Sequence, residues 1–151
     1  MQTIPVIFSR SILPLSYVIR LLDKGAFICP FSHVGIISEC GNYVYEAKGG
    51  EGVVKTPLWA FKDRVSHWET GLFPTLNKQK AYERAESQLG KPYDLMGAIA
   101  IGVPFINREW GCPDSWFCSE YLAYCSGIFE ERHISNIGVN FCYALTRTKR
   151  L

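Results

Sequence analysis

The chain has 151 residues, which is enough for one hydrophobic core, and we expect a single domain over residues 1–151. Its composition of 48% apolar and 20% charged residues is typical of a globular domain. A net charge of +2 gives no support for nucleic-acid binding, and no apolar run is long enough to act as a membrane anchor.

The cysteines do not indicate a disulfide scaffold or a metal site. There are six, at positions 29, 40, 112, 118, 125 and 142. The chain is larger than small disulfide-dependent domains, and the lack of a C-x-x-C pair gives little support for structural zinc. We expect no cofactor. A signal peptide is not indicated either, because Pro14 interrupts a short apolar run between Arg10 and Arg20. We therefore expect synthesis in the cytoplasm with free thiols.

The first half of the chain reads mainly as strands. A helix is expected over residues 11–22, and strands are predicted over residues 3–8, 32–38, 43–47, 53–57 and 66–73. The turn Glu39–Asn42 joins two of these strands into an antiparallel hairpin. Residues 59–64 are expected as a helical turn or a loop.

A capped helix follows these strands. It is predicted over residues 77–89, with Asn77 as its cap and Gly90 after its end. Residues 91–115 read as a loop-rich segment, and the short apolar runs 134–139 and 141–145 have no predicted state. The fold class we predict is α+β, with antiparallel hairpins and helices around them.

A second helix is predicted to begin at Cys118. The residues that share one face of it, at helical spacing, are Tyr121, Tyr124, Cys125 and Ile128. Ser115 and Ser119 are both candidates for the N-cap. Glu120 suits the positive end of the helix dipole, and Gly127 suits the C-terminal exit.

Cys118 stands where an extended segment turns into that helix. Backbone N–H groups at a helix N-terminus point toward such a sulfur, and the helix dipole favours the thiolate. A cysteine in this position is a candidate nucleophile if a histidine can reach it. The alternative is a small buried apolar side chain without a chemical role.

Three histidines are candidates for the base. His33 begins an apolar strand, whereas His67 and His133 are expected at the surface. A catalytic imidazole needs a third group that fixes its tautomer. A hairpin turn centred on residues 39–40 places Glu46 directly opposite His33, and one centred on residues 41–42 places them two pairs apart on the same face. A one-residue slip separates the two faces, so the sequence permits this pair without requiring it.

Four motifs occur in a fixed order along the chain. They are Ser-His-Val-Gly-Ile-Ile, Tyr-Val-Tyr-Glu-Ala, Leu-Gly-Lys-Pro-Tyr-Asp and Phe-Cys-Ser-Glu-Tyr. Together they resemble the landmarks of the permuted NlpC-type cysteine peptidases, a circularly permuted branch of the papain-like superfamily related to the lecithin:retinol acyltransferase-like enzymes. The resemblance covers roughly residues 4–145. It implies a papain-like antiparallel sheet packed against helices, with the nucleophile at a helix N-terminus.

The resemblance also implies roles for four residues. Cys118 would be the nucleophile, His33 the base, Glu46 the orienting third residue, and Tyr93 the tyrosine near the oxyanion. Many NlpC-type enzymes have Asp before the nucleophile, where this chain has Phe117. This departure weakens the inference about the substrate more than the inference about the reaction.

The expected function is hydrolysis of an amide bond through a thioester. The family implies bacterial cell-wall stem peptides as substrate, and a missing signal peptide fits a phage wall hydrolase docked on a virion tail. One alternative is a lipid-directed thiol amidase or acyltransferase, with Trp110, Trp116 and residues 99–105 as candidates for an apolar groove. Another is a non-catalytic structural module of a larger assembly.

Overall fold

The protein has an α+β fold built on one antiparallel sheet of five strands, in the order β4-β3-β2-β1-β5. The computed structural model describes residues 1–10, 31–100, 114–130, 134 and 137–146. The strands are β1 (Gln2–Arg10), β2 (His33–Ile37), β3 (Tyr43–Lys48), β4 (Gly52–Pro57) and β5 (His67–Thr75). All five predicted strands are therefore present, with small differences at their ends.

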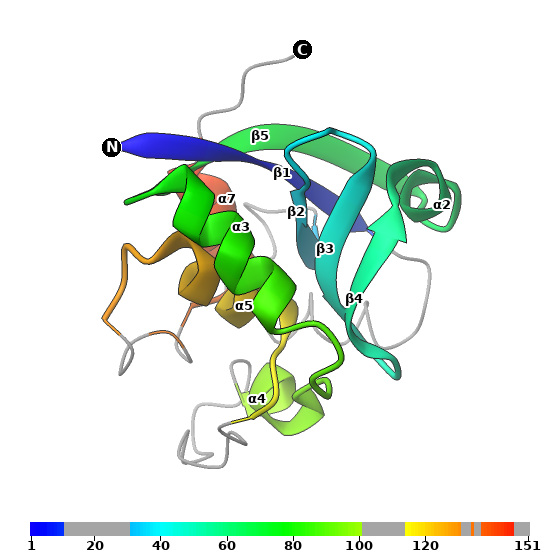
Figure 1. The fold of residues 1–151 in the computed structure, drawn as a ribbon. Helices are drawn as coiled ribbons and strands as arrows, with labels where there is room; N and C mark the ends of the chain where they lie inside the picture. Colours follow the sequence, from blue (N-terminus) through cyan, green and yellow to red (C-terminus); the bar gives the residue numbers. More distant parts are fainter. Residues whose placement is uncertain (11–30, 101–113, 131–133, 135–136, 147–151) are drawn as a thin grey trace.

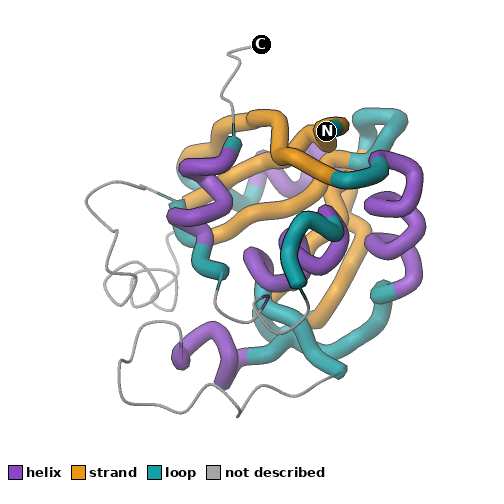
Figure 2. The backbone as a smooth tube through the Cα atoms, turned by 90° about the vertical axis from the view of Figure 1, so that its left-hand side faces the viewer, coloured by secondary structure: helices purple, strands orange, loops and turns teal. Residues whose placement is uncertain are grey.

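Helices lie on both sides of this sheet. They are α2 (Leu58–Asp63), α3 (Lys78–Ser87), α4 (Leu95–Ala100), α5 (Cys118–Ser126) and α7 (Val139–Leu145). In Figure 1, α3, α5 and α7 lie to one side of the sheet and α2 lies at the other side, next to β4. The tube in Figure 2 shows helices beside and below the strands, with part of the sheet along the top of the view.

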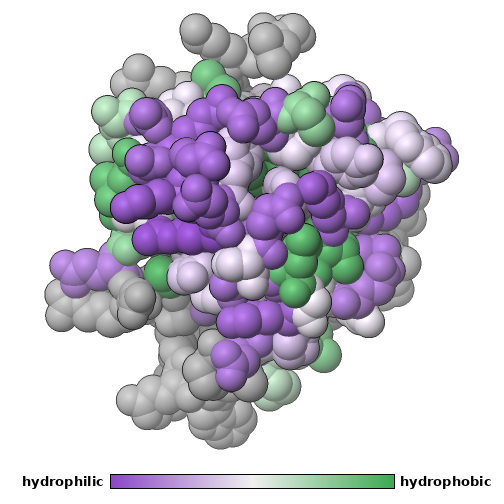
Figure 3. All heavy atoms as spheres, in the orientation of Figure 1, coloured by the Kyte–Doolittle hydropathy of each residue, from purple (hydrophilic) through white to green (hydrophobic). Residues whose placement is uncertain are grey.

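Alternation along the strands separates two apolar clusters. Ile4, Val6 and Phe8 of β1 face the larger core, which α3, α5 and α7 cover. Ile7 faces the other side, where it packs with Val44 and Phe61 beneath α2. The sheet is thus buried on both faces. Figure 3 shows hydrophilic side chains gathered over α3, whose outer face meets solvent.

Two helical predictions differ in outcome. The helix expected over residues 77–89 is confirmed as α3, whose cap Asn77 accepts a hydrogen bond from the Lys80 N–H at 2.9 Å. The loop prediction for residues 91–115 is wrong at α4, because the Asp94 carboxylate caps this short helix by accepting from the Gly97 N–H at 2.8 Å. The helix predicted over residues 11–22 lies outside the described residues.

The β2–β3 hairpin adopts a register between the two that the sequence left open. Ile36 pairs with Tyr45 and Ile37 pairs with Val44. Continuing this ladder by one residue places Glu46 beside Gly35, so Glu46 keeps the same face as His33 but is not its direct partner. The turn Glu39–Asn42 is present, and Gly41 within it has φ +76°, which favours glycine.

Gly35 occupies a position where a side chain has no room. A Cβ added there would collide with Val44 Cγ1 and would lie 3.2 Å from the Tyr45 carbonyl oxygen. The missing side chain leaves open the diagonal path between His33 and Glu46.

In the part of the chain that is described, no helix has the length and apolarity needed to cross a bilayer.

Candidate active site

Cys118 is the first residue of α5, and an extended segment leads into it. Phe117 is the N-cap, with φ −102° and ψ 166°, and its carbonyl accepts the first intrahelical bond from the Tyr121 N–H at 2.9 Å. The N–H groups of the first helical turn therefore have no partner within the helix and remain available around the sulfur. The predicted helix start at Cys118 is confirmed.

The end signals of α5 are only partly as predicted. Gly127 ends the helix in the left-handed region with φ 68°, as expected. The prediction of a serine cap is wrong, because Phe117 is the cap and the Ser119 hydroxyl instead donates to the Ile137 carbonyl at 2.6 Å. This hydrogen bond ties the first turn of α5 to the segment before α7.

Glu120 does not supply the simple negative charge expected in the first turn. Burial raises the pKa of its carboxyl to about 7, the hydrogen bond from the Phe117 N–H opposes this change, and the charge of Asp94 adds to it. Glu120 therefore completes half of a capping box at the N-cap while carrying only part of a charge near neutral pH.

A short backbone ladder holds the segment that precedes Cys118. Tyr93 and Trp116 form a parallel bridge, which we call the Tyr93–Trp116 bridge. Within it the Asp94 N–H donates to the Trp116 carbonyl at 3.0 Å, and the Trp116 N–H donates to the Pro92 carbonyl at 3.1 Å. This ladder fixes Tyr93 beside the start of α5.

The Tyr93 side chain lies in the electrostatic reach of Cys118. Burial raises the pKa of the Tyr93 hydroxyl, and the negative charges of Cys118 and Asp94 raise it further. The hydroxyl therefore stays protonated and can act as a hydrogen-bond donor near the sulfur.

His33 contacts both of its predicted partners. Its side chain is 19% exposed, and its Nε2 lies 2.7 Å from Glu46 Oε2. Cys118 lies near the same ring and raises the pKa of the imidazole. Because Nε2 is engaged by Glu46, Nδ1 is the nitrogen left to meet the sulfur.

The charge state of His33 follows from these contacts. Burial alone lowers the pKa of the imidazolium, but the interactions with Cys118 and Glu46 outweigh burial and raise the pKa to about 9. Near neutral pH the ring is therefore protonated, which suits an imidazolium beside a thiolate.

Glu46 is fully buried, and three side chains donate to its carboxylate. His33 and the Arg64 guanidinium both bond Oε2, and the Thr56 hydroxyl donates to Oε1 at 2.6 Å. Burial alone would raise the pKa of this carboxyl, but His33, then Arg64 and Thr56, outweigh it and lower the pKa to about 2. Glu46 is therefore ionised at any ordinary pH.

An aromatic ring packs against both Arg64 and His33. The Phe61 ring stacks on the His33 ring with centroids 6.1 Å apart, and the Arg64 guanidinium lies 4.8 Å from the centroid of Phe61. Both Phe61 and Arg64 come from α2 and the residue that ends it. The short helix α2 therefore positions two side chains around the imidazole.

Sequence reasoning missed Thr56, Phe61 and Arg64. Thr56 pairs with Val44 in the β3–β4 ladder, which puts it on the face of Glu46, and this could have been anticipated from the strand alternation. Arg64 lies beyond a helix that was expected only as a turn or loop, and no local pattern linked it to Glu46.

His67 does not join the site. His67 is at the surface, as predicted, with its side chain 48% exposed and Nε2 3.4 Å from a Glu69 oxygen. His133, Trp110 and residues 101–105 lie outside the described residues. Within the described ranges, no group of three His, Cys, Asp or Glu side chains is placed to hold a metal ion.

Comparison with known proteins identifies a similar solved structure. No family model and no curated protein matches the chain. A structure described as "metalloprotein yiiX from Escherichia coli O157:H7, DUF1105" is similar with a TM-score of 0.57 and 26% identity. The similarity covers 82% of this chain and 63% of that one, so the chain spans less than two thirds of that protein's length. The likeness supports the α+β fold.

Proposed function

We propose that the protein is a thiol hydrolase of amide bonds, with Cys118 as nucleophile, His33 as base and Glu46 as the orienting residue. The observation that carries the proposal is the position of the His33 ring between Cys118 and the buried Glu46 carboxylate. A nucleophile, a base and a third group that orients the base form the arrangement that acyl transfer requires. The permuted NlpC-type branch of the papain-like superfamily is the family we propose for it.

The proposed reaction has two stages. The Cys118 thiolate attacks the amide carbonyl, and the protonated His33 gives its Nδ1 proton to the leaving amine, so that a thioester and a neutral imidazole remain. His33 then takes a proton from water, which attacks the thioester and releases the acid. First-turn N–H groups of α5 and the Tyr93 hydroxyl would receive the oxyanion, and one such donor is worth about 3 kcal/mol.

The proposed substrate is a bacterial cell-wall stem peptide, and the proposed setting is a phage virion. Both rest on the sequence resemblance. The similar Escherichia coli protein is described as a metalloprotein. Among the described residues of this chain the donor set does not fit a metal, because Arg64 and His33 already occupy Glu46 Oε2. The proposal therefore includes no metal-dependent step.

Incubation with purified peptidoglycan tests the proposal. We expect released peptide fragments by mass spectrometry, with a new amino and a new carboxyl end at one bond. The Cys118→Ser protein is the matched control and should release none. Release by both proteins would contradict the assignment of Cys118, and release by neither would contradict the substrate.

A lipid substrate is the second candidate, because two apolar side chains on α4 are exposed next to Tyr93. Leu95 is 45% exposed and Met96 is 47% exposed. An acyl chain could lie against them beside the nucleophile. Turnover of an acyl-amide lipid, without peptidoglycan cleavage, would favour this candidate. Absence of turnover on both substrates would favour the non-catalytic module.

A further inference from the structure

Arg64 contacts the candidate site through Glu46 rather than through the reacting atoms. Its guanidinium donates to Glu46 Oε2, the same oxygen that meets His33 Nε2. The Arg64 side chain is 29% exposed, whereas Glu46 has no exposed surface. Arg64 thus brings a permanent positive charge from the surface to a buried carboxylate.

The charge around Glu46 changes when His33 loses its proton. Three groups face the carboxylate in the described structure: His33 from β2, Thr56 from β4 and Arg64 after α2. Thr56 is neutral, so once His33 is neutral Arg64 is the remaining cation. A buried carboxylate without a cationic partner tends to take up a proton.

Protonation of Glu46 would change the tautomer of His33. An ionised Glu46 accepts a hydrogen bond from the Nε2–H group of His33. The lone pair of Nδ1 then points toward Cys118. A protonated Glu46 would donate to Nε2 instead, and the ring proton would then sit on Nδ1. A ring in that state cannot accept a proton from water on the side of Cys118.

We propose that Arg64 is a positioning residue, which keeps Glu46 ionised while His33 is neutral and so leaves Nδ1 free to act as the base. The inference rests on the proposed function, in which the neutral ring occurs in the thioester stage. Phe61 supports the geometry, because its ring packs against both the guanidinium and the imidazole. Arg64 touches no reacting atom.

The direct test is ¹⁵N NMR of the His33 ring with Cys118 blocked as a methyl disulfide. Blocking removes the thiolate, so that the neutral ring can be observed without a substrate. We expect the wild type to keep the Nε2–H tautomer throughout its neutral range. In Arg64→Gln, the Nδ1–H tautomer should become populated, most strongly at the acid end of the neutral range, because a Glu46 carboxylate without a cationic partner takes up a proton more readily.

Matched variants separate charge from packing. Arg64→Lys should restore the Nε2–H tautomer, because the charge returns. Arg84→Gln removes another half-buried guanidinium, which donates to the Tyr124 carbonyl at 3.1 Å, and should have no effect on the tautomer. Arg64→Met keeps an apolar stem over Phe61 and should behave like Arg64→Gln. A wild-type tautomer in folded Arg64→Gln or Arg64→Met, or failure of both to fold, would overturn the proposal.

A kinetic test distinguishes this proposal from the proposed function. With an active substrate, Arg64→Gln should slow release of the acyl group, so that kcat and KM fall together by roughly tenfold or more while kcat/KM changes little. If the proposed function is wrong, the wild type itself has no turnover. If only the role of Arg64 is wrong, the variant turns over with wild-type kcat and KM.

Discussion

Glu46 Oε2 lies 2.7 Å from His33 Nε2, although the two residues are not partners in the β2–β3 ladder. The contact runs diagonally past Gly35, which has no side chain to obstruct it. Diagonal neighbours on one face of an antiparallel sheet are farther apart than direct partners, and long side chains can bridge that distance. The side chains of His33 and Glu46 are both long enough to meet across this diagonal.

The first prediction concerns Gly35→Ala. The added methyl group would collide with Val44 and approach the Tyr45 carbonyl, so we expect a loss of about 1–3 kcal/mol in the free energy of unfolding, measured with urea. Gly49→Ala is the control, because a Cβ at Gly49 meets no atom within 4 Å. Equal stability of the two variants would show that the tight contact at Gly35 is relieved without cost.

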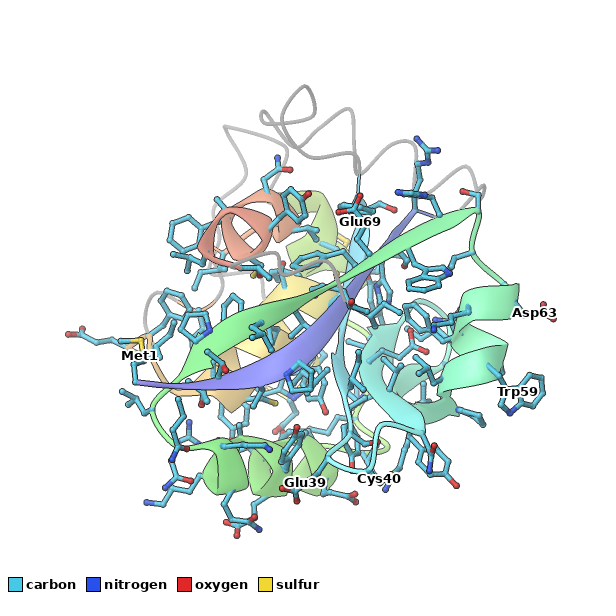
Figure 4. The ribbon with its side chains drawn as sticks, turned by 90° about the horizontal axis from the view of Figure 1, so that it is seen from above. Met1, Glu39, Cys40, Trp59, Asp63 and Glu69 are labelled. Atoms are coloured by element: carbon cyan, nitrogen blue, oxygen red, sulfur yellow. The ribbon has the colours of Figure 1, made fainter. Side chains whose placement is uncertain are left out.

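The second prediction concerns thiol reactivity. Cys40 is exposed at the hairpin tip (Figure 4), and a hydrogen bond with Ser38 lowers its pKa. Cys125 is buried, and burial raises its pKa. In a Cys40→Ser background we therefore expect iodoacetamide to label Cys118 much faster than Cys125, measured by peptide mass mapping.

The size of the reagent should matter in that experiment. Cys118 is only 5% exposed, so a bulky maleimide should react more slowly with it than iodoacetamide does. Labelling of Cys118 as slow as that of Cys125 would favour a purely structural cysteine.

The third prediction concerns the pH dependence of stability. The pKa of His33 is raised to about 9 in the folded protein, so its stabilisation is complete below pH 6.5 and is lost as the pH rises through 9. The pKa of Glu46 is lowered to about 2, so its stabilisation is complete above pH 4.5 and is lost as the pH falls toward 2. The pair should stabilise the fold most between pH 4.5 and 6.5.

Urea unfolding at pH 6 and pH 10 measures the His33 contribution. We expect the wild type to lose on the order of 3 kcal/mol more than His33→Gln between these values, since one pKa unit corresponds to about 1.4 kcal/mol. Parallel losses in the two proteins would contradict the raised pKa of His33.

The fourth prediction ranks variants of the three central residues. Cys118→Ser should remove all turnover and leave the melting temperature nearly unchanged, because the two side chains have similar size. His33→Ala should lower kcat by roughly 10²–10⁴. Glu46→Gln should lower it less than His33→Ala does, because the base itself remains. The opposite order would show that Glu46 and His33 have other roles.

The fifth prediction concerns the Tyr93 hydroxyl. Tyr93→Phe should lower kcat by roughly 10²–10³ with little change in KM if the hydroxyl donates to the oxyanion. The Tyr93–Trp116 bridge uses backbone atoms and should persist in this variant. Tyr82→Phe is the control, because the buried Tyr82 hydroxyl has no hydrogen-bond partner in the described structure. Equal activity of the two variants would contradict the oxyanion role.

The strands were predictable because each contains β-branched or aromatic residues and is bounded by turn signals. The shared face of His33 and Glu46 was also within reach, because it depends only on the parity of the hairpin register. The helix α4 was not, since its cap is the side chain of Asp94 in a segment rich in glycine and proline. Six residues give too few helical repeats to show a period.

The side chains of Thr56 and Arg64, which donate to Glu46, were not predicted from the sequence, for a different reason. Thr56 and Arg64 reach the carboxylate from 10 and 18 positions away in the chain. Such contacts depend on how β4 and α2 fold back over the sheet, and sequence spacing does not encode that path. The outward direction of Trp59 and Asp63 from α2, seen in Figure 4, likewise follows from which helix face packs on Phe61 and its neighbours.

The Tyr93–Trp116 bridge makes the position of Cys118 independent of the chain segment that connects Tyr93 to Trp116. Both ends of the connection from Leu95 to Ser115 are pinned by the same pair of hydrogen bonds. Lengthening such a connection costs little free energy, since loop-closure entropy grows slowly with length. We therefore expect insertions in this connection to leave Cys118 in place.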